Sequence, residues 1–234
     1  MQYHVSEITP DYACCTIEVS PFEQNCRVIW NKLSKIGVLI DPGTDLTHIF
    51  EKIQQHNIKI KEIWITHGHI DHAGEALDAA EKLNVKIIGP HIKDKELLEN
   101  MREHVENMKD KFPIYQYFIN TKNCTPSKWL EEGDKLEIDG LEFTVLYCPG
   151  HSPGHVAYHS EKAKCLISGD VLFYESVGRT DLYGSCQNTL KRTILEKILP
   201  LPDDTLVLSG HGQDFTLGEV RNRNAFLVKW TREK

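Results

Sequence analysis

Three histidines and an aspartate fall within six residues, in the segment His67-Gly-His-Ile-Asp-His72. A β-branched run from Ile60 to Ile65 precedes the segment, and a stretch that favours helix, Ala73 to Leu83, follows it. A polar turn that is rich in histidine by chance is the alternative, and the density of the cluster argues against it. The segment therefore predicts a fold in which a strand delivers these side chains to a common site.

The spacing within the segment suits metal ions. Alternate side chains of an extended chain share a face, so His67 and His69 can converge on one ion. Asp71 and His72 follow at the helix start and can turn toward a second ion. The small Gly68 lets the backbone pass close to the site. Imidazole and carboxylate groups are suitable ligands for zinc and other divalent metals, so we expect a metal site here.

Three later residues have the same placement at the end of a strand. His151, Asp170 and His211 each follow an apolar run, and each is preceded directly by glycine. The three runs are 141–147, 165–168 and 205–208. Taken singly, Asp170 could be a helix cap and His211 a loop residue. Together with the histidine cluster, they are what a rigid scaffold that supplies a metal site requires.

Strands and helices alternate along the chain, which predicts an α/β fold. The other expected strands are 27–30, 37–40, 85–88 and 155–159, and the other expected helices are 46–56 and 190–199. A charged segment, Lys93 to Phe112, has apolar residues three or four positions apart and predicts a single amphipathic helix. That helix either covers the core or forms a lid over the site.

Composition narrows the class of partner and the compartment. The 234 residues suit one large domain, and the formal net charge of -7 opposes the phosphate-neutralising surface of a nucleic-acid binder. We therefore expect a small-molecule substrate. A secretory signal is not apparent, and no apolar run approaches the roughly 18 residues of a membrane span. The seven cysteines are scattered without a Cys-x-x-Cys pair, which favours the reducing cytoplasm.

The order of these motifs resembles the metallo-β-lactamase superfamily over nearly the whole chain, from about Asn25 to Leu227. Within it, the chain is most similar to the glyoxalase II-like (hydroxyacylglutathione hydrolase-like) enzymes of the short bacterial type. The motifs that carry the similarity are Thr66-His-Gly-His-Ile-Asp-His-Ala-Gly74, Gly169-Asp-Val-Leu-Phe173, Gly178-Arg-Thr-Asp181, Gly210-His-Gly212 and Thr216-x-Gly218-x-Glu219. The chain departs from the family pattern at Leu182 to Ser185, where proline and two glycines are usual, and at Ala225, where proline is usual.

The resemblance implies a fold, a ligand set and cofactors. The implied fold is a four-layer αββα sandwich, with residues 1–234 as a single domain. The implied ligands are His67, His69 and His151 for one metal, Asp71, His72 and His211 for a second, and Asp170 bridging both. We expect two divalent ions, zinc in the first place, with iron and manganese as alternatives.

This site suits hydrolysis. Two ions roughly 3.5–4 Å apart can share a hydroxide, because they lower the pKa of bound water toward about 7. We expect this hydroxide to attack a thioester such as S-lactoylglutathione, with Asp71 as the catalytic carboxylate that orients it. Thiolate leaves without a strong general acid. Arg179 either binds carboxylates of the substrate or makes a structural ion pair, and His155 is expected to support the loop of His151.

Three other functions stay open. A persulfide dioxygenase of the same superfamily would hold one iron on His67, His151 and Asp170, since two histidines and a carboxylate suit non-haem iron. The complete set of seven ligands weighs against that enzyme. A non-catalytic binding module would be expected to lose ligands. A phosphodiesterase or nuclease could use a two-metal site, but the acidic balance counts against it.

Overall fold

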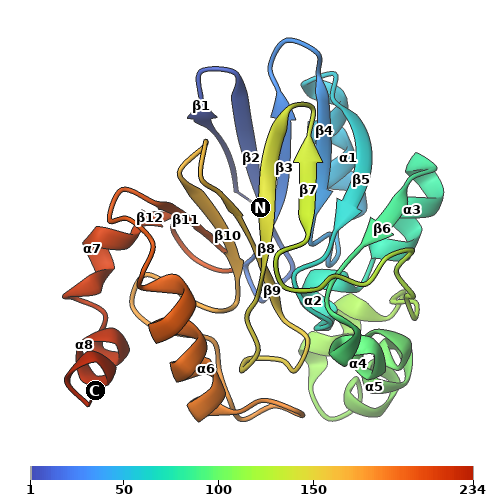
Figure 1. Cartoon of the computed structure of the whole chain (residues 1–234). Coiled ribbons are helices and arrows are strands. Elements are labelled where there is room, and N and C mark those ends of the chain that lie inside the picture. The colour runs from blue at the N-terminus through green and yellow to red at the C-terminus, as the bar shows by residue number, and fades with distance from the viewer. Residues whose placement is uncertain (1, 234) are drawn as a thin grey trace. The chain divides into compact units, whose positions relative to one another are not determined.

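The computed structural model describes residues 2–233, and the chain divides into two compact units. The first unit comprises the residues up to 130 together with 138–140. The second comprises 131–137 and the residues from 141 onward. Each unit is built on a six-stranded sheet with helices packed against it, so the expected α/β class is confirmed (Figure 1).

The sheet of the first unit has the strand order β1-β2-β3-β4-β5-β6. Its strands are β1 (Tyr3–Thr9), β2 (Tyr12–Val19), β3 (Gln24–Asn31), β4 (Ile36–Ile40), β5 (Lys59–Trp64) and β6 (Lys86–Ile88). The first four strands are antiparallel, whereas β4, β5 and β6 run parallel. Parallel neighbours need crossover helices, and α1 (Leu46–Gln55) and α3 (Ala76–Leu83) supply them. The carboxyl ends of β4 and β5 therefore meet at one edge of the sheet.

The core of the first unit lies between this sheet and its helices. Ile49 of α1 and Ala79 of α3 are buried in one cluster with Cys15, Val28 and Ile63 from the strands. These helices contribute buried residues three or four positions apart, as the apolar spacing predicts. The strands and helices expected before residue 90 are confirmed, except that the predicted helix at 73–83 begins at Ala76, after the short α2 (Ile70–Ala73).

The prediction of one continuous helix over 93–112 is wrong. The segment consists of the 3₁₀ turn η1 (Ile92–Asp94), α4 (Lys95–Glu99) and α5 (Met101–Met108), followed by the 3₁₀ segment η2 (Pro113–Phe118). Asn100 separates the two helices with φ −120°, and its side-chain amide donates to the carbonyl of Glu96. Such a local bond offers the backbone an alternative to helix. The apolar stripe is buried at Met101 and Val105 but not at Phe112, so the helical segment covers the core in part.

The sheet of the second unit has the order β12-β11-β10-β9-β8-β7. Its strands are β7 (Lys135–Ile138), β8 (Leu141–Tyr147), β9 (Val156–Ser160), β10 (Cys165–Gly169), β11 (Leu206–Ser209) and β12 (Phe215–Thr216). β10 and β11 are parallel, and the helix between them is α6 (Gln187–Thr193), which continues as the π-helical η3 (Ile194–Ile198). With α7 (Leu217–Arg221) and α8 (Ala225–Arg232), these helices bury Leu190, Ile194 and Leu227. The expected strands of this half are confirmed, and its helix starts at Gln187 rather than Leu190.

Among residues 2–233, no helix is long and apolar enough to cross a membrane.

Candidate metal centre

The first unit contains four of the seven predicted ligands, in the segment between β5 and α3. His67 and His69 face each other, since Nε2 of His67 lies 3.0 Å from Nδ1 of His69 and the rings meet edge to face. The ring centroid of His67 also lies 4.1 Å from that of His72. Three imidazoles are thus gathered at the carboxyl end of β5, as the strand-end placement predicts.

His72 is held by Asp41, a carboxylate that is not among the predicted ligands. Nδ1 of His72 lies 2.9 Å from Oδ2 of Asp41, and both side chains are buried. Asp41 also accepts hydrogen bonds from the backbone N–H and the hydroxyl of Thr66, at 2.8 and 2.6 Å. The carboxylate therefore binds the Nδ1 proton of His72 and turns Nε2 toward Asp71, whose Oδ2 lies 3.7 Å away. Such a carboxylate fixes the tautomer of a metal-binding histidine and raises its basicity.

We expect Asp41→Asn to weaken metal binding roughly 10- to 100-fold, because a neutral amide is a poorer partner for the Nδ1–H of His72. Zinc titration of the metal-stripped protein measures the change. Asp139→Asn is the matched control and should bind zinc like the wild type. Asp139 also has a left-handed backbone, with φ 46° against 51° for Asp41, and accepts a hydroxyl hydrogen bond, from Ser34. Unchanged zinc affinity in Asp41→Asn would contradict the role of Asp41.

A second buried carboxylate fixes the backbone between the first two histidines. The N–H of Gly68 donates to Oδ2 of Asp94 at 2.8 Å, and Asp94 is fully buried at the start of α4. A Cβ at Gly68 would lie 2.8 Å from Cβ of Leu97, closer than carbon atoms normally approach. Glycine at 68 therefore permits the close approach of this loop to α4.

The second unit contains the other three predicted ligands, at the ends of β8, β10 and β11. Nε2 of His151 and Nε2 of His211 each lie 3.4 Å from the same oxygen, Oδ2 of Asp170. Nδ1 of His151 is 2.8 Å from the backbone carbonyl of Arg179, which can only accept a hydrogen bond; in the neutral ring the proton therefore lies on Nδ1, and Nε2 presents a lone pair. Nε2 of His151 and Oδ2 of Asp170 therefore face each other at a separation that would allow both atoms to bind the same cation. Two imidazoles and a carboxylate are a donor set for zinc and similar divalent ions.

Two neighbours fix Asp170 in the second unit. The backbone N–H of Asp170 donates to Nε2 of the buried His155 at 3.0 Å, so His155 supports this part of the site rather than offering that nitrogen to a metal. A Cβ at Gly178 would lie 1.9 Å from the carbonyl oxygen of Asp170 and 3.0 Å from the ring of His151. Glycine at 178 is therefore required by the close packing against two predicted ligands.

Arg179 makes a structural ion pair, one of the two roles expected for it. Its Nε and a terminal nitrogen each lie 2.8 Å from an oxygen of Asp181, and both side chains are largely exposed. The guanidinium lowers the pKa of Asp181 to about 2. The backbone carbonyl of Arg179, rather than its guanidinium, is the group that contacts His151. A contact between the guanidinium and a substrate stays a prediction.

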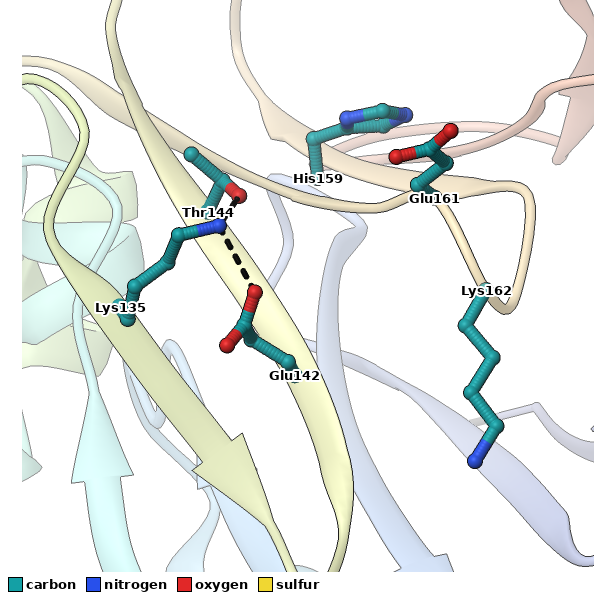
Figure 2. A pocket seen from close by; sticks show the side chains of 6 residues that line it. All are labelled: Lys135, Glu142, Thr144, His159, Glu161 and Lys162. Carbon is teal, nitrogen blue, oxygen red and sulfur yellow. Dashed lines mark hydrogen bonds and ion pairs between the residues drawn. The ribbon is translucent and has the colours of Figure 1, made fainter.

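A polar hollow of about 420 Å³ lies elsewhere on the second unit (Figure 2). Its lining residues are Lys135, Glu142, Thr144, His159, Glu161 and Lys162. Nζ of Lys135 is paired with Glu142 at 2.7 Å and hydrogen-bonded to Thr144 at 2.6 Å. The hollow lies at the start of β8 and the end of β9, whereas His151 lies in the connection between the end of β8 and the start of β9. It is therefore separate from the predicted ligands.

Comparisons with known proteins found a matching family and relatives over most of the chain. The family model described as the metallo-beta-lactamase superfamily matches residues 19–211. A hydroxyacylglutathione hydrolase, GloC, of Haemophilus influenzae is 36% identical over 212 residues, which cover 90% of this chain and 96% of that protein. The crystal structure of the BLEG-1 B3 metallo-beta-lactamase has a TM-score of 0.81 and 32% identity, covering 92% of this chain and 99% of that one. The crystal structure of TTHA1623 in a di-iron-bound form has a TM-score of 0.77 and 31% identity, covering 91% and 99%.

Proposed function

The chain belongs to the metallo-β-lactamase superfamily, and from that premise we propose that this metallo-hydrolase cleaves thioesters such as S-lactoylglutathione. The family and the fold expected from the sequence are confirmed. The substrate class is supported by the relative from Haemophilus influenzae, which is named a hydroxyacylglutathione hydrolase and matches this chain over nearly its full length.

The observation that carries the proposal is the pair of complementary ligand groups. The first unit offers three imidazoles and Asp71, and the second offers two imidazoles around Asp170. We propose that the two units act as one domain and bring these groups together, because the family model extends across both of them. One ion would then be bound by His67, His69 and His151, and the other by Asp71, His72 and His211, with Asp170 between them.

Zinc is the metal that we propose, because the set is dominated by imidazole nitrogen. The similar structure in a di-iron-bound form supports iron as the alternative. Two bound ions would supply a hydroxide near neutral pH and polarise the carbonyl of the substrate. The residues of the chain supply orientation, since Asp41 fixes His72 and the carbonyl of Arg179 fixes His151. We propose that the Asp71 carboxylate accepts a hydrogen bond from the attacking water.

A protein nucleophile is poorly supported by the cysteines. Six of the seven are buried, and burial raises the pKa of Cys15, Cys124 and Cys148 to about 12. Thiols with such a pKa are protonated at neutral pH and are weak nucleophiles. These buried thiols are therefore excluded as nucleophiles, whereas Cys186 is exposed and hydrogen bonding with Thr189 lowers its pKa; activated water is the nucleophile that we propose.

The proposal is tested by a screen of the purified full chain loaded separately with zinc, iron and manganese. The substrates are S-lactoylglutathione, glutathione persulfide, a β-lactam and a generic phosphodiester. We expect two ions per chain and thioester cleavage with kcat of about 1–10³ s⁻¹, with much slower turnover of the other compounds. One iron per chain, together with oxygen uptake on the persulfide, would contradict the thioesterase proposal and support the persulfide dioxygenase instead. Preferred cleavage of the β-lactam or the phosphodiester would equally reject a thioester substrate.

A further inference from the structure

A group of aromatic side chains lies on the first unit between the β2–β3 turn and the helical segment η2. The ring of Phe22 stacks on Phe118, with centroids 5.5 Å apart and an interplanar angle of 22°. Tyr115 contacts Phe22, Phe118 and Phe112 at centroid distances of 6.3 to 6.5 Å. Phe118 is buried at the base of the group, whereas Phe112 is 50% exposed. These four residues, called the aromatic wall below, present an apolar surface that is only partly covered.

The turn that carries Phe22 is held in an uncommon conformation. Ser20 and Glu23 have φ angles of 61° and 55°, in the left-handed region that L-residues other than glycine rarely adopt. The N–H of Ser20 donates to Asp45 at 2.9 Å, and the N–H of Phe22 donates to the hydroxyl of Ser20 at 3.1 Å. Such backbone persists only where its surroundings impose it, and it is concentrated at functional sites. The fold thus keeps Phe22 beside η2 at an energetic cost.

The aromatic wall lies at the same edge of the sheet as the predicted ligands of the first unit. β3 runs antiparallel to β4, so the start of β3 is at the edge where β4 and β5 end. Gln24, the first residue of β3, is fully buried, and its side-chain nitrogen lies 3.5 Å from Nδ1 of His72. Phe22 is therefore two residues away from a direct contact with a predicted ligand.

The chemistry of the wall suits one part of a thioester. Nε2 of His104, the polar neighbour of the wall, lies 3.3 Å from the hydroxyl of Tyr115, and burial lowers the pKa of His104, which favours its uncharged form. The thiol part of a glutathione thioester carries carboxylates and an ammonium group, which an uncharged aromatic surface does not satisfy. An acyl group with a phenyl ring or an extended alkyl chain matches it through ring stacking and burial.

We propose that the aromatic wall binds the acyl group of the substrate and selects thioesters with an aromatic or extended apolar acyl chain over small hydroxyacyl thioesters. This inference rests on the proposed thioesterase function. It assigns Phe22, and beside it Phe112 and Tyr115, to substrate specificity.

The test compares S-mandeloylglutathione, which has a phenyl ring on the acyl group, with S-lactoylglutathione, which has a methyl group there. We expect wild-type kcat/KM to favour the phenyl substrate. Phe22→Ala should lower kcat/KM roughly ten-fold for the phenyl substrate, mainly through KM, and by less than about two-fold for the methyl substrate. Leu33→Ala is the matched control, because Leu33 is 94% exposed in the β3–β4 turn, which lies at the opposite edge of the sheet.

Metal content and the melting temperature are measured for each variant, to establish that it is folded and metal-loaded. If Phe22→Ala fails to fold, the same comparison of the two substrates is made with Phe112→Ala, because Phe112 is half exposed and its removal should leave the fold intact. Cleavage of neither thioester by the wild type would reject the proposed function itself. A wild type that prefers the methyl substrate, or equal losses on both substrates in folded and metal-loaded variants, would overturn the role of the wall while leaving the thioesterase intact.

Discussion

His69→Ala is expected to lower thioester turnover on the order of 10³-fold and to leave the protein with less than its full complement of metal. The reason is that Nδ1 of His69 lies 3.0 Å from Nε2 of His67, so the pair offers two nitrogens to one ion. With one nitrogen removed, the ion binds weakly, and the activated water and the polarised carbonyl are lost with it. Turnover of S-lactoylglutathione and metal content by elemental analysis measure both effects.

The fold of the His69→Ala variant should survive. His69 is partly exposed and is not part of the buried apolar cluster of its unit, so the melting temperature of the metal-free protein should be close to that of the metal-free wild type. His159→Ala is the matched control, because this histidine lines the polar hollow away from the ligands. Wild-type metal content and turnover in His69→Ala would refute the assignment of the site.

The placement of the predicted ligands at strand ends could be expected from the sequence, because each of them follows an apolar strand. Strand ends are visible in a sequence as β-branched runs followed by glycine, and His151, Asp170 and His211 fit that pattern. Asp41 is not singled out by the sequence, because an aspartate between an apolar run and Pro42 is typical of a turn. Its position at the carboxyl end of β4, beside β5, was the available signal. The contact with His72 depends on strand pairing, which the local sequence does not specify.

Errors in the predicted elements have a different cause. The strand β2 was not predicted, because seven of its eight residues are buried and it therefore lacks the apolar–polar alternation of a half-exposed strand. The helix predicted over 93–112 has correct apolar spacing up to Val105, but Asn100 interrupts it through a side-chain bond. The periodicity of a sequence reports which face is apolar, and it does not report a local break in the backbone.

Gly43→Ala is expected to destabilise the fold by about 3 kcal/mol and to weaken metal binding through His72, although Gly43 is not a ligand. A Cβ at this position would lie 1.6 Å from the carbonyl oxygen of Asp71 and 2.2 Å from its carbonyl carbon. Both are main-chain atoms, so no side-chain rotation relieves the overlap, and the backbone between Asp71 and His72 must move. For a chain of this length, such a loss lowers the melting temperature by roughly 6–12 °C.

The matched control for Gly43→Ala separates crowding from backbone preference. Gly133 has φ 81°, and a Cβ there would meet no atom within 4 Å, so Gly133→Ala should cost only about 1–2 kcal/mol, through its left-handed backbone. Gly43 has no such backbone restriction, and its whole cost comes from the contact with Asp71. Thermal unfolding and zinc titration of both variants decide the matter. The idea would be contradicted if Gly43→Ala were as stable as Gly133→Ala and bound zinc like the wild type. In that case, the close packing of the β4–α1 connection against Asp71 would not be needed to position the predicted ligands Asp71 and His72.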